Sequence, residues 1–356
     1  PKNICICYLY LYLYLCSGVI EPVMAAILCH HFLYSPFWSA LPLPLHLRRH
    51  SSSLYSFRPP LPSSRKDRIS CYPQSSSSSH MDPQSGGRKR FMEFPYVSDP
   101  HRDLMVELVS MVETRLDSYL LPCNLPPDVQ YYHNQSGTAH ATLHTRSGLN
   151  SSTIDFILGS WIHCELPSGG ALNITSLSAY LNTSTDAPNF LIELIRSSPT
   201  SLVLILDLPP RKDLVLHPEY LHTFYEDSQL DRQRQLLEKI PEVRPYFSSS
   251  LYIRCVVSPT AILVRIDTEA GGTDRMEEIV QDHVSPIAKE VLGMWLDRCA
   301  CGEREVGESE RAYLAKRDQV TKSKTIEIDL GSSLPRLFGQ EVAARVLGAM
   351  QEVFNA

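Results

Sequence analysis

One acidic residue stands in a short apolar segment, where its carboxyl group could act as a proton donor. Glu193 lies in the segment 190–196, between Ile192 and Leu194. Removal from water disfavours the charged form of a carboxyl and raises its pKa, which makes it a competent acid near neutral pH. A glutamate that faces solvent at a sheet edge, or one paired with Arg196 or another base, explains the same pattern.

A second candidate carboxyl occurs near the C-terminus, in the segment Thr325–Leu330. Its charged and apolar residues alternate, which predicts a short strand with Glu327 and Asp329 on one face. An ordinary half-exposed strand has the same alternation, so this segment alone does not establish a function.

The segments that must position these carboxyls are predicted to be β-strands. They are rich in β-branched and apolar residues, and Pro, Gly, Asn and Ser separate them. The connections between consecutive segments are short, which favours hairpins and an antiparallel sheet. The predicted strands are 139–146, 152–162, 171–181, 189–196, 201–208, 251–257, 261–267 and 325–330.

Helical spacing of apolar residues predicts helices at the beginning, middle and end of the same region. Asp99 is the expected N-cap of the first helix, and Pro286 should kink or split the long helix 276–298. The segment 301–324 is predicted to be a mobile surface connection. The predicted helices are 99–120, 218–226, 228–239, 276–298 and 337–354. Together these elements predict an α/β fold, a three-layer α/β/α sandwich with a central antiparallel sheet.

Charge divides the chain into a basic leader and an acidic body. Residues 1–90 carry a net charge of about +7 and residues 91–356 about −13, which together give −6. We interpret 1–23 as non-native sequence upstream of a start at Met24, 24–90 as a disordered Ser/Pro/Arg-rich transit peptide, and 91–356 as one catalytic domain. An acidic body argues against nucleic acid as a partner.

Common cofactor motifs are missing. The sequence has no G-x-G-x-x-G after a predicted strand, no Walker loop and no H-E-x-x-H, and its body cysteines are scattered without a C-x-x-C pair. The sequence therefore predicts no bound nicotinamide, flavin, ATP or metal. Any redox chemistry would need an external electron source and the conjugated system of the substrate.

Several longer blocks of the body carry a family resemblance. They are Glu93–Ser98, Ile154–Phe156, Gly159–Cys164, Ala187–Phe190, Leu202–Pro209, Arg211–Leu216, Asp282–Pro286 and Phe338–Gly339. With these blocks the body resembles the red chlorophyll catabolite reductases, plant relatives of the ferredoxin-dependent bilin reductases. The resemblance covers essentially all of 91–356.

This resemblance implies a concrete activity. Members of the family are homodimeric α/β/α sandwiches without a bound redox cofactor. They take electrons one at a time from reduced ferredoxin to reduce the C20/C1 double bond of red chlorophyll catabolite, which gives the primary fluorescent catabolite. The implied location is the chloroplast stroma, with the mitochondrion as a second compartment, and a further implied partner is the pheophorbide-opening oxygenase. The two acids of the family match Glu193 and Asp329.

Four further residues are candidate substrate contacts. Val257 matches a position at which relatives carry Phe or Val, so it could shape the pocket wall and the stereochemistry at C1, or be an ordinary core valine. Trp161 and His163 could touch the pigment, or be structural. Arg211 could receive a propionate or the acidic face of ferredoxin, or be a solvated loop charge.

Two rival functions use the same features. A tetrapyrrole-binding protein that sequesters the pigment without reducing it would share the apolar pocket and the import segment, but it would not need two acids. A cofactor-free lyase or isomerase would share the sheet and its helices.

Overall fold

Strands of the body form one antiparallel sheet that carries Glu193 near its middle. The computed structural model describes residues 83–167, 169–248 and 250–355. The segments interpreted as upstream sequence, 1–23, and as most of the transit peptide, 24–82, lie outside the described residues. The boundary predicted at residue 91 lies within the helix Pro83–Glu93.

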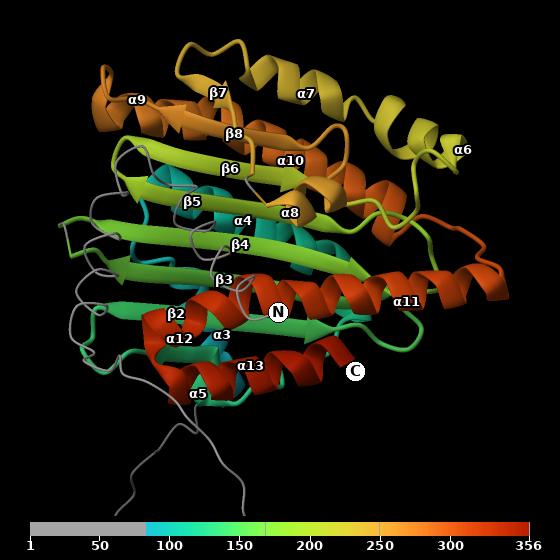
Figure 1. Cartoon of the computed structure of the whole chain (residues 1–356), viewed down its shortest axis with the longest axis horizontal. Coiled ribbons are helices and arrows are strands. Elements are labelled where there is room, and N and C mark those ends of the chain that lie inside the picture. The colour runs from blue at the N-terminus through green and yellow to red at the C-terminus, as the bar shows by residue number, and fades with distance from the viewer. Residues whose placement is uncertain (1–82, 168, 249, 356) are drawn as a thin grey trace, which may run out of the picture. The chain divides into compact units, whose positions relative to one another are not determined.

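The sheet has eight strands in the order β1-β2-β3-β4-β5-β6-β8-β7 (Figure 1). Every neighbouring pair is antiparallel, which confirms the predicted sheet type. The strands are β1 Tyr131–His133, β2 Ala139–Ser147, β3 Ile154–Glu165, β4 Ala171–Leu181, β5 Phe190–Ser198, β6 Ser201–Asp207, β7 Val243–Pro245 and β8 Ile262–Asp267. Short turns connect most of them, so the sheet is largely a meander.

Helices cover both faces of the sheet, which confirms the predicted three layers. Figure 1 shows α4 behind the strands and α11, α12 and α13 in front of them. The helices in chain order are α3 Pro83–Glu93, α4 Asp99–Leu116, α5 Pro127–Gln130, α6 Pro218–Leu221, α7 Leu230–Leu237, α8 Leu251–Val256, α9 Gly272–Ile279, α10 Ser285–Trp295, α11 Glu308–Thr325, α12 Gly331–Phe338 and α13 Gln340–Asn355.

The face that packs against α4 and α10, which we call the α4 face, holds the largest part of the core. Phe190, Ile192 and Leu194 of β5 point to it and are at most 1% exposed. Helix α3 also packs on this face. A Cβ on Gly159 would lie 2.3 Å from the ring of Phe91, so this strand position needs a glycine to admit α3.

The opposite face, which we call the α11 face, carries a smaller apolar cluster. Side chains of β2 and β3, including Leu143 and Phe156, pack against Phe338, Val346 and other residues of α12 and α13. The C-terminal helical layer therefore covers the β2–β3 end of this face.

The first predicted helix is confirmed with its cap shifted by one residue. Ser98 is the N-cap of α4, and Asp99 and Pro100 occupy the first turn, where an acidic side chain favours the positive end of the helix dipole. Pro286 is the second residue of α10, which follows the π-helical turn Val280–Val284 directly. The junction residues keep helical backbone angles, so the proline does not split the long helix.

Two predicted strands are wrong. The segment 251–257 forms the short helix α8, whose N-cap Ser250 accepts a hydrogen bond from the amide of Ile253. The segment 325–330 forms the end of α11 and a π-helical turn, Ile326–Leu330. In both segments tertiary packing overrides the local preference for a strand.

Two further corrections concern the C-terminal region. The segment 301–324, predicted as a mobile connection, contains the 18-residue helix α11. The predicted helix 337–354 is divided into α12 and α13 at Gly339, whose φ of 82° suits a residue without a Cβ. Among the described residues, none of the helices is long and apolar enough to cross a membrane.

Candidate active site on the α11 face

Glu193 occupies a central position of the α11 face. It lies on β5, opposite Ser176 of β4 and Ile205 of β6, and its side chain is half-buried. A sheet-edge position, one of the alternatives to a functional role, is therefore excluded. Arg196, the partner that the sequence offered, points to the α4 face and pairs with Glu277 at 2.7 Å.

Polar side chains form a short row with Glu193 across the middle strands. Ser160 of β3 faces Ser176 of β4, which in turn faces Glu193 of β5, and the two serine hydroxyls share a hydrogen bond of 2.8 Å. Apolar residues flank the row on both sides; they are Leu158, Ile162, Ile174, Leu191 and Ile195. A flat apolar ligand could lie on this surface with the carboxyl of Glu193 against it.

Helices border this row on two sides. Helices α12 and α13 pack over β2 and β3, and α8 lies in front of β5 and β6 in Figure 1, with β4 between these two groups. Leu251, at the start of α8, is 68% exposed, and Phe247, which precedes it, is 80% exposed.

Asp329 belongs to the C-terminal layer on the same side of the sheet. It lies in the π-helical turn Ile326–Leu330, whose end residues Ile326 and Leu330 pack against the cluster of β2, β3, α12 and α13. Residues two apart do not share a face of a helix, so the strand argument that paired Glu327 with Asp329 does not hold. The backbone of Asp329 and the side chain of Glu193 are nevertheless on the same side of the sheet.

Val257 is half-buried and follows α8 directly. Its neighbour Ser258 donates two hydrogen bonds to Asp207 at the end of β6, one from its amide at 2.9 Å and one from its hydroxyl. Asp207 of β6 pairs with Leu191 of β5. Leu191 is two residues from Glu193 in the same strand, so both lie on the same face. These contacts place Val257 at the border of the α11 face.

Asp207 is a buried acid that the sequence pattern did not single out. It is 2% exposed, and burial raises its pKa to about 6. Hydrogen bonds from Ser258 and Leu208 lower the pKa, but burial has the larger effect. In the sequence, Asp207 is a charged residue at the end of the apolar segment Leu202–Leu208. Because ordinary strands often end in this way, the pattern does not distinguish Asp207.

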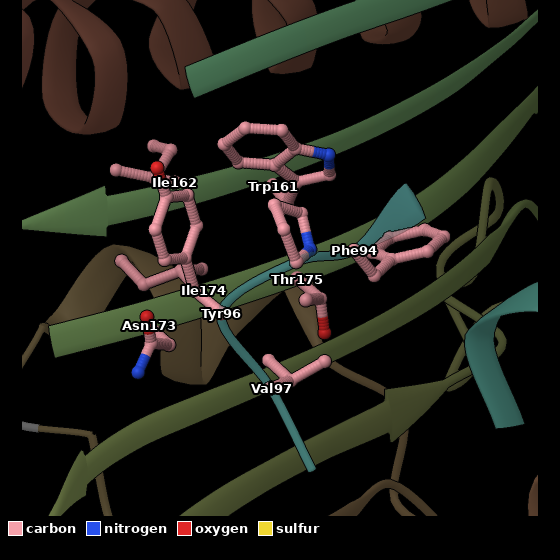
Figure 2. Close-up of a pocket in the computed structure, with 9 residues that line it drawn as sticks. Phe94, Tyr96, Val97, Trp161, Ile162, Asn173, Ile174 and Thr175 are labelled. Carbon is pink, nitrogen blue, oxygen red and sulfur yellow. The ribbon is translucent and has the colours of Figure 1, made fainter. Parts of the chain in front are cut away.

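Trp161 and His163 lie on the other face of the sheet from Glu193. The indole Nε1 of Trp161 donates to the carbonyl of Phe91 at 3.1 Å, and the ring of His163 stacks on Tyr96 with 3.8 Å between the centroids. Figure 2 shows Tyr96, Trp161 and Ile174 around the pocket at this place. Its volume of about 10 Å³ suffices for a single water molecule.

Arg211 is completely buried rather than solvated. Its guanidinium donates to both carboxylate oxygens of Asp318 on α11, at 3.2 and 2.5 Å, and to the carbonyls of Thr185 and Asn182. All of these partners belong to the chain itself, so Arg211 ties the loop after β6 to the C-terminal layer. Among the described residues, no cluster of three or more His, Cys, Asp or Glu side chains has the arrangement of a metal site.

The fold defined by this sheet and its helices is that of a bilin reductase. The structure is similar to that of phytochromobilin synthase from tomato in complex with biliverdin, with a TM-score of 0.52 over 71% of this chain and 84% of that chain. The two sequences are 16% identical, so this similarity concerns the fold.

Sequence comparison places the chain more narrowly. The family model described as red chlorophyll catabolite reductase (RCC reductase) matches residues 100–352. The chain is 54% identical over 311 residues to the chloroplastic red chlorophyll catabolite reductase of Arabidopsis thaliana, with 86% of this chain and 97% of the relative covered. It is 49% identical over 257 residues to the chloroplastic red chlorophyll catabolite reductase 1 of rice, with 72% and 78% covered. The chain belongs to the red chlorophyll catabolite reductase family.

Proposed function

We propose that this chain reduces the C20/C1 double bond of red chlorophyll catabolite and releases the primary fluorescent catabolite. The observation that carries the proposal is the family match over residues 100–352, together with relatives of that name at 54% and 49% identity. The position of Glu193 on a half-buried, mainly apolar surface supports it, because such a surface suits a conjugated tetrapyrrole.

The reaction needs two electrons and two protons. Two reduced ferredoxins each give one electron, and no redox cofactor resident in the chain takes part. An added electron makes the conjugated pigment more basic, so each electron calls for a proton from a nearby acid. The carboxyl of Glu193 donates the first proton, and Asp329 orients the substrate or supplies the next.

The α11 face supplies the remaining requirements. The apolar residues beside the row of Ser160, Ser176 and Glu193 contact the planar pigment and exclude water. Glu193 must carry a proton before it can act as the donor. Val257 forms part of the pocket wall and selects the face of C1 that receives the proton.

The proposed setting follows from the same relatives. Those from Arabidopsis thaliana and rice are both named chloroplastic, which supports the chloroplast stroma as the location, with the mitochondrion as a second compartment. The proposed partners are ferredoxin, a second copy of the chain and the pheophorbide-opening oxygenase.

An anaerobic assay tests the proposal. The full chain is incubated with red chlorophyll catabolite, ferredoxin and a ferredoxin-reducing system, and the fluorescent product is followed by emission and chromatography. We expect product that depends on both ferredoxin and the chain. Pigment binding without fluorescent product would instead identify a sequestering protein, and loss of pigment without consumption of electrons would identify a lyase or isomerase.

A further inference from the structure

The contacts of Asp207 concentrate on the peptide group that follows Val257. The amide nitrogen of Ser258 belongs to the peptide bond between Val257 and Ser258, and it donates to Asp207 at 2.9 Å. The hydroxyl of Ser258 donates to the other carboxylate oxygen. Two hydrogen bonds from one residue to one carboxylate fix both the position and the orientation of this peptide.

The other side of Val257 is also held, but by its own helix. The amide of Val257 donates to the carbonyl of Ile253 at 3.2 Å, which closes the last turn of α8. That helix has six residues, and isolated helices of this length are not stable in water. Asp207 is one contact that ties the end of α8 to the sheet.

Ser258 also bonds to the turn that leads into β8, so its contact with Asp207 holds this turn as well. Its hydroxyl accepts from the amide of Thr260 at 3.2 Å, and its carbonyl accepts from the amide of Ala261 at 3.3 Å. Loss of the carboxylate of Asp207 would thus release a turn of several residues rather than a single side chain.

Asp207 lies close to Glu193, the proposed proton donor. Asp207 pairs with Leu191, and Glu193 pairs with Ile205, so Asp207 and Glu193 are diagonal neighbours on the α11 face. Diagonal neighbours across two strands are separated by about 7–8 Å. A displacement of Val257 would therefore change the wall of the surface that Glu193 serves.

A comparison with a second buried aspartate shows that Asp207 is unusual. Asp186 is 3% exposed and pairs with Lys212 at 2.9 Å and with Arg304. Burial alone would raise its pKa, but these two cations lower it. The groups that bond Asp207 are neutral, and its pKa is raised to about 6, mainly by burial. Asp207 is held in place by amide and hydroxyl donors rather than by a cation.

We propose that Asp207 is a positioning residue that holds Val257 against the bound pigment, and that it thereby fixes the face of C1 that is protonated. The inference rests on the proposed function. Asp207 does not act as an acid here; its carboxylate acts through Ser258 and Val257.

Two substitutions separate positioning from general stability. Asp207→Ala removes both acceptors. Asp207→Asn can keep the anchor, because its amide oxygen accepts from the amide of Ser258 while its NH₂ donates to the Ser258 hydroxyl. Asp186→Ala is the matched control, since it removes a buried aspartate that pairs with Lys212 and Arg304 rather than with the turn after Val257.

The experiment measures the product epimers by chiral chromatography, together with kcat and KM for red chlorophyll catabolite. We expect Asp207→Ala to give both epimers and a KM raised about fivefold or more, equivalent to roughly 1 kcal/mol. We expect Asp207→Asn and Asp186→Ala to give the single epimer of the unmodified chain.

A single epimer with an unchanged KM in folded Asp207→Ala would overturn the inference, and so would the same mixture of epimers in Asp186→Ala. If Asp207→Ala does not fold, Ser258→Ala takes its place: it removes the hydroxyl bond to Asp207 and the bond that this hydroxyl accepts from the amide of Thr260, but it keeps the amide bond to Asp207. It should give a smaller shift in the same direction, while no shift would overturn the inference. Failure of the proposed function is distinguishable, because the unmodified chain and all variants would then form no fluorescent product.

Discussion

The two faces of the sheet differ in how deeply their polar side chains are buried. On the α4 face, polar side chains are buried beneath helices: His101 of α4 shares a hydrogen bond of 2.8 Å with Thr175, and Arg196 pairs with Glu277 of α9. On the α11 face, Ser176 and Glu193 are half-buried between apolar neighbours in the middle of the sheet. The first arrangement stabilises a core, and the second presents hydroxyl and carboxyl groups at a surface that a ligand could cover.

This difference separates the structural candidates from the functional ones. Trp161 and His163 belong to the α4 face, where Phe91 and Tyr96 cover them. Glu193 belongs to the α11 face, as do the backbone of Asp329 and the anchor of Val257. The proposed site therefore draws on β5, β6, α8 and the C-terminal layer, and the helices of the α4 face pack beneath it.

The largest expected effect concerns the link between the sheet and the C-terminal layer. Arg211→Met would leave Asp318 buried without its cation, which typically costs about 3–5 kcal/mol. The free energy of unfolding from urea titration measures this loss. The double variant Arg211→Met/Asp318→Leu should recover part of it, because the unpaired charge is then removed as well.

Arg211 also tests where substrate contacts lie. A variant that keeps its stability but shows a higher KM would contradict the structural role and would return Arg211 to the substrate-binding residues. A loss of stability with an unchanged KM at permissive temperature would confirm that the buried ion pair serves the fold.

Much of the sheet could be predicted from the sequence. The pattern of β4 predicted its bounds at 171 and 181, and the structure has the same bounds. Helix α11 was missed because its buried residues are only Leu314 and Asp318, so it has no apolar stripe to reveal a helical period. The segment 251–257 was misread as a strand because Ile253, Val256 and Val257 favour strands, while the cap at Ser250 and the anchor at Asp207 lie outside the pattern.

The site was only partly within reach of the sequence. Alternation shows that Trp161 and His163 share a face of β3, but their relation to Glu193 depends on the register of three strands, which alternation does not give. Asp207 was missed for a similar reason, since its partner Ser258 is 51 residues away in the sequence. The apolar neighbours of Glu193 singled it out, and the family resemblance proposed it together with Asp329, because neither argument depends on register.

Two adjacent residues of β4 sharpen the contrast between the faces. Thr175 points to the α4 face and is 1% exposed, so Thr175→Leu should overpack the core and cost about 1–3 kcal/mol of stability. Ser176 points to the α11 face, so Ser176→Leu should change stability by about 1 kcal/mol or less, the typical value of one hydrogen bond.

Substrate kinetics of the same two variants should show the opposite order. Ser176→Leu places a bulky side chain beside Glu193 and should raise KM for the pigment about tenfold, whereas folded Thr175→Leu should keep the KM of the unmodified chain. Equal KM values in both variants would contradict the assignment of the substrate to the α11 face.

A further expected effect is the acid sensitivity of the α4 face. Burial, with a contribution from Arg196, lowers the pKa of His101 to about 3, while an unfolded histidine has a pKa of about 6.5. The neutral ring thus contributes stability that is fully present above pH 6.5 and is lost as the pH falls toward 3. The expected slope is about 1.4 kcal/mol per pH unit for this one residue.

Urea titrations between pH 7 and 4.5 measure that slope, and His101→Gln should remove it. His144 contributes in the same direction, because burial lowers its pKa to about 4. The slope of His101→Gln should therefore be lower than that of the unmodified chain but not zero. Identical slopes would show that His101 is protonated in the folded chain.

The most direct test of the central claim compares binding and turnover in Glu193→Gln. The amide keeps the shape of the side chain but has no proton to donate as an acid. We predict that this variant binds red chlorophyll catabolite with a Kd within about threefold of the unmodified chain, while turnover with reduced ferredoxin falls about 100-fold or more. Glu277→Gln, on the α4 face, is the matched control and should keep its turnover. Full turnover in Glu193→Gln would contradict the role of this carboxyl as the proton donor.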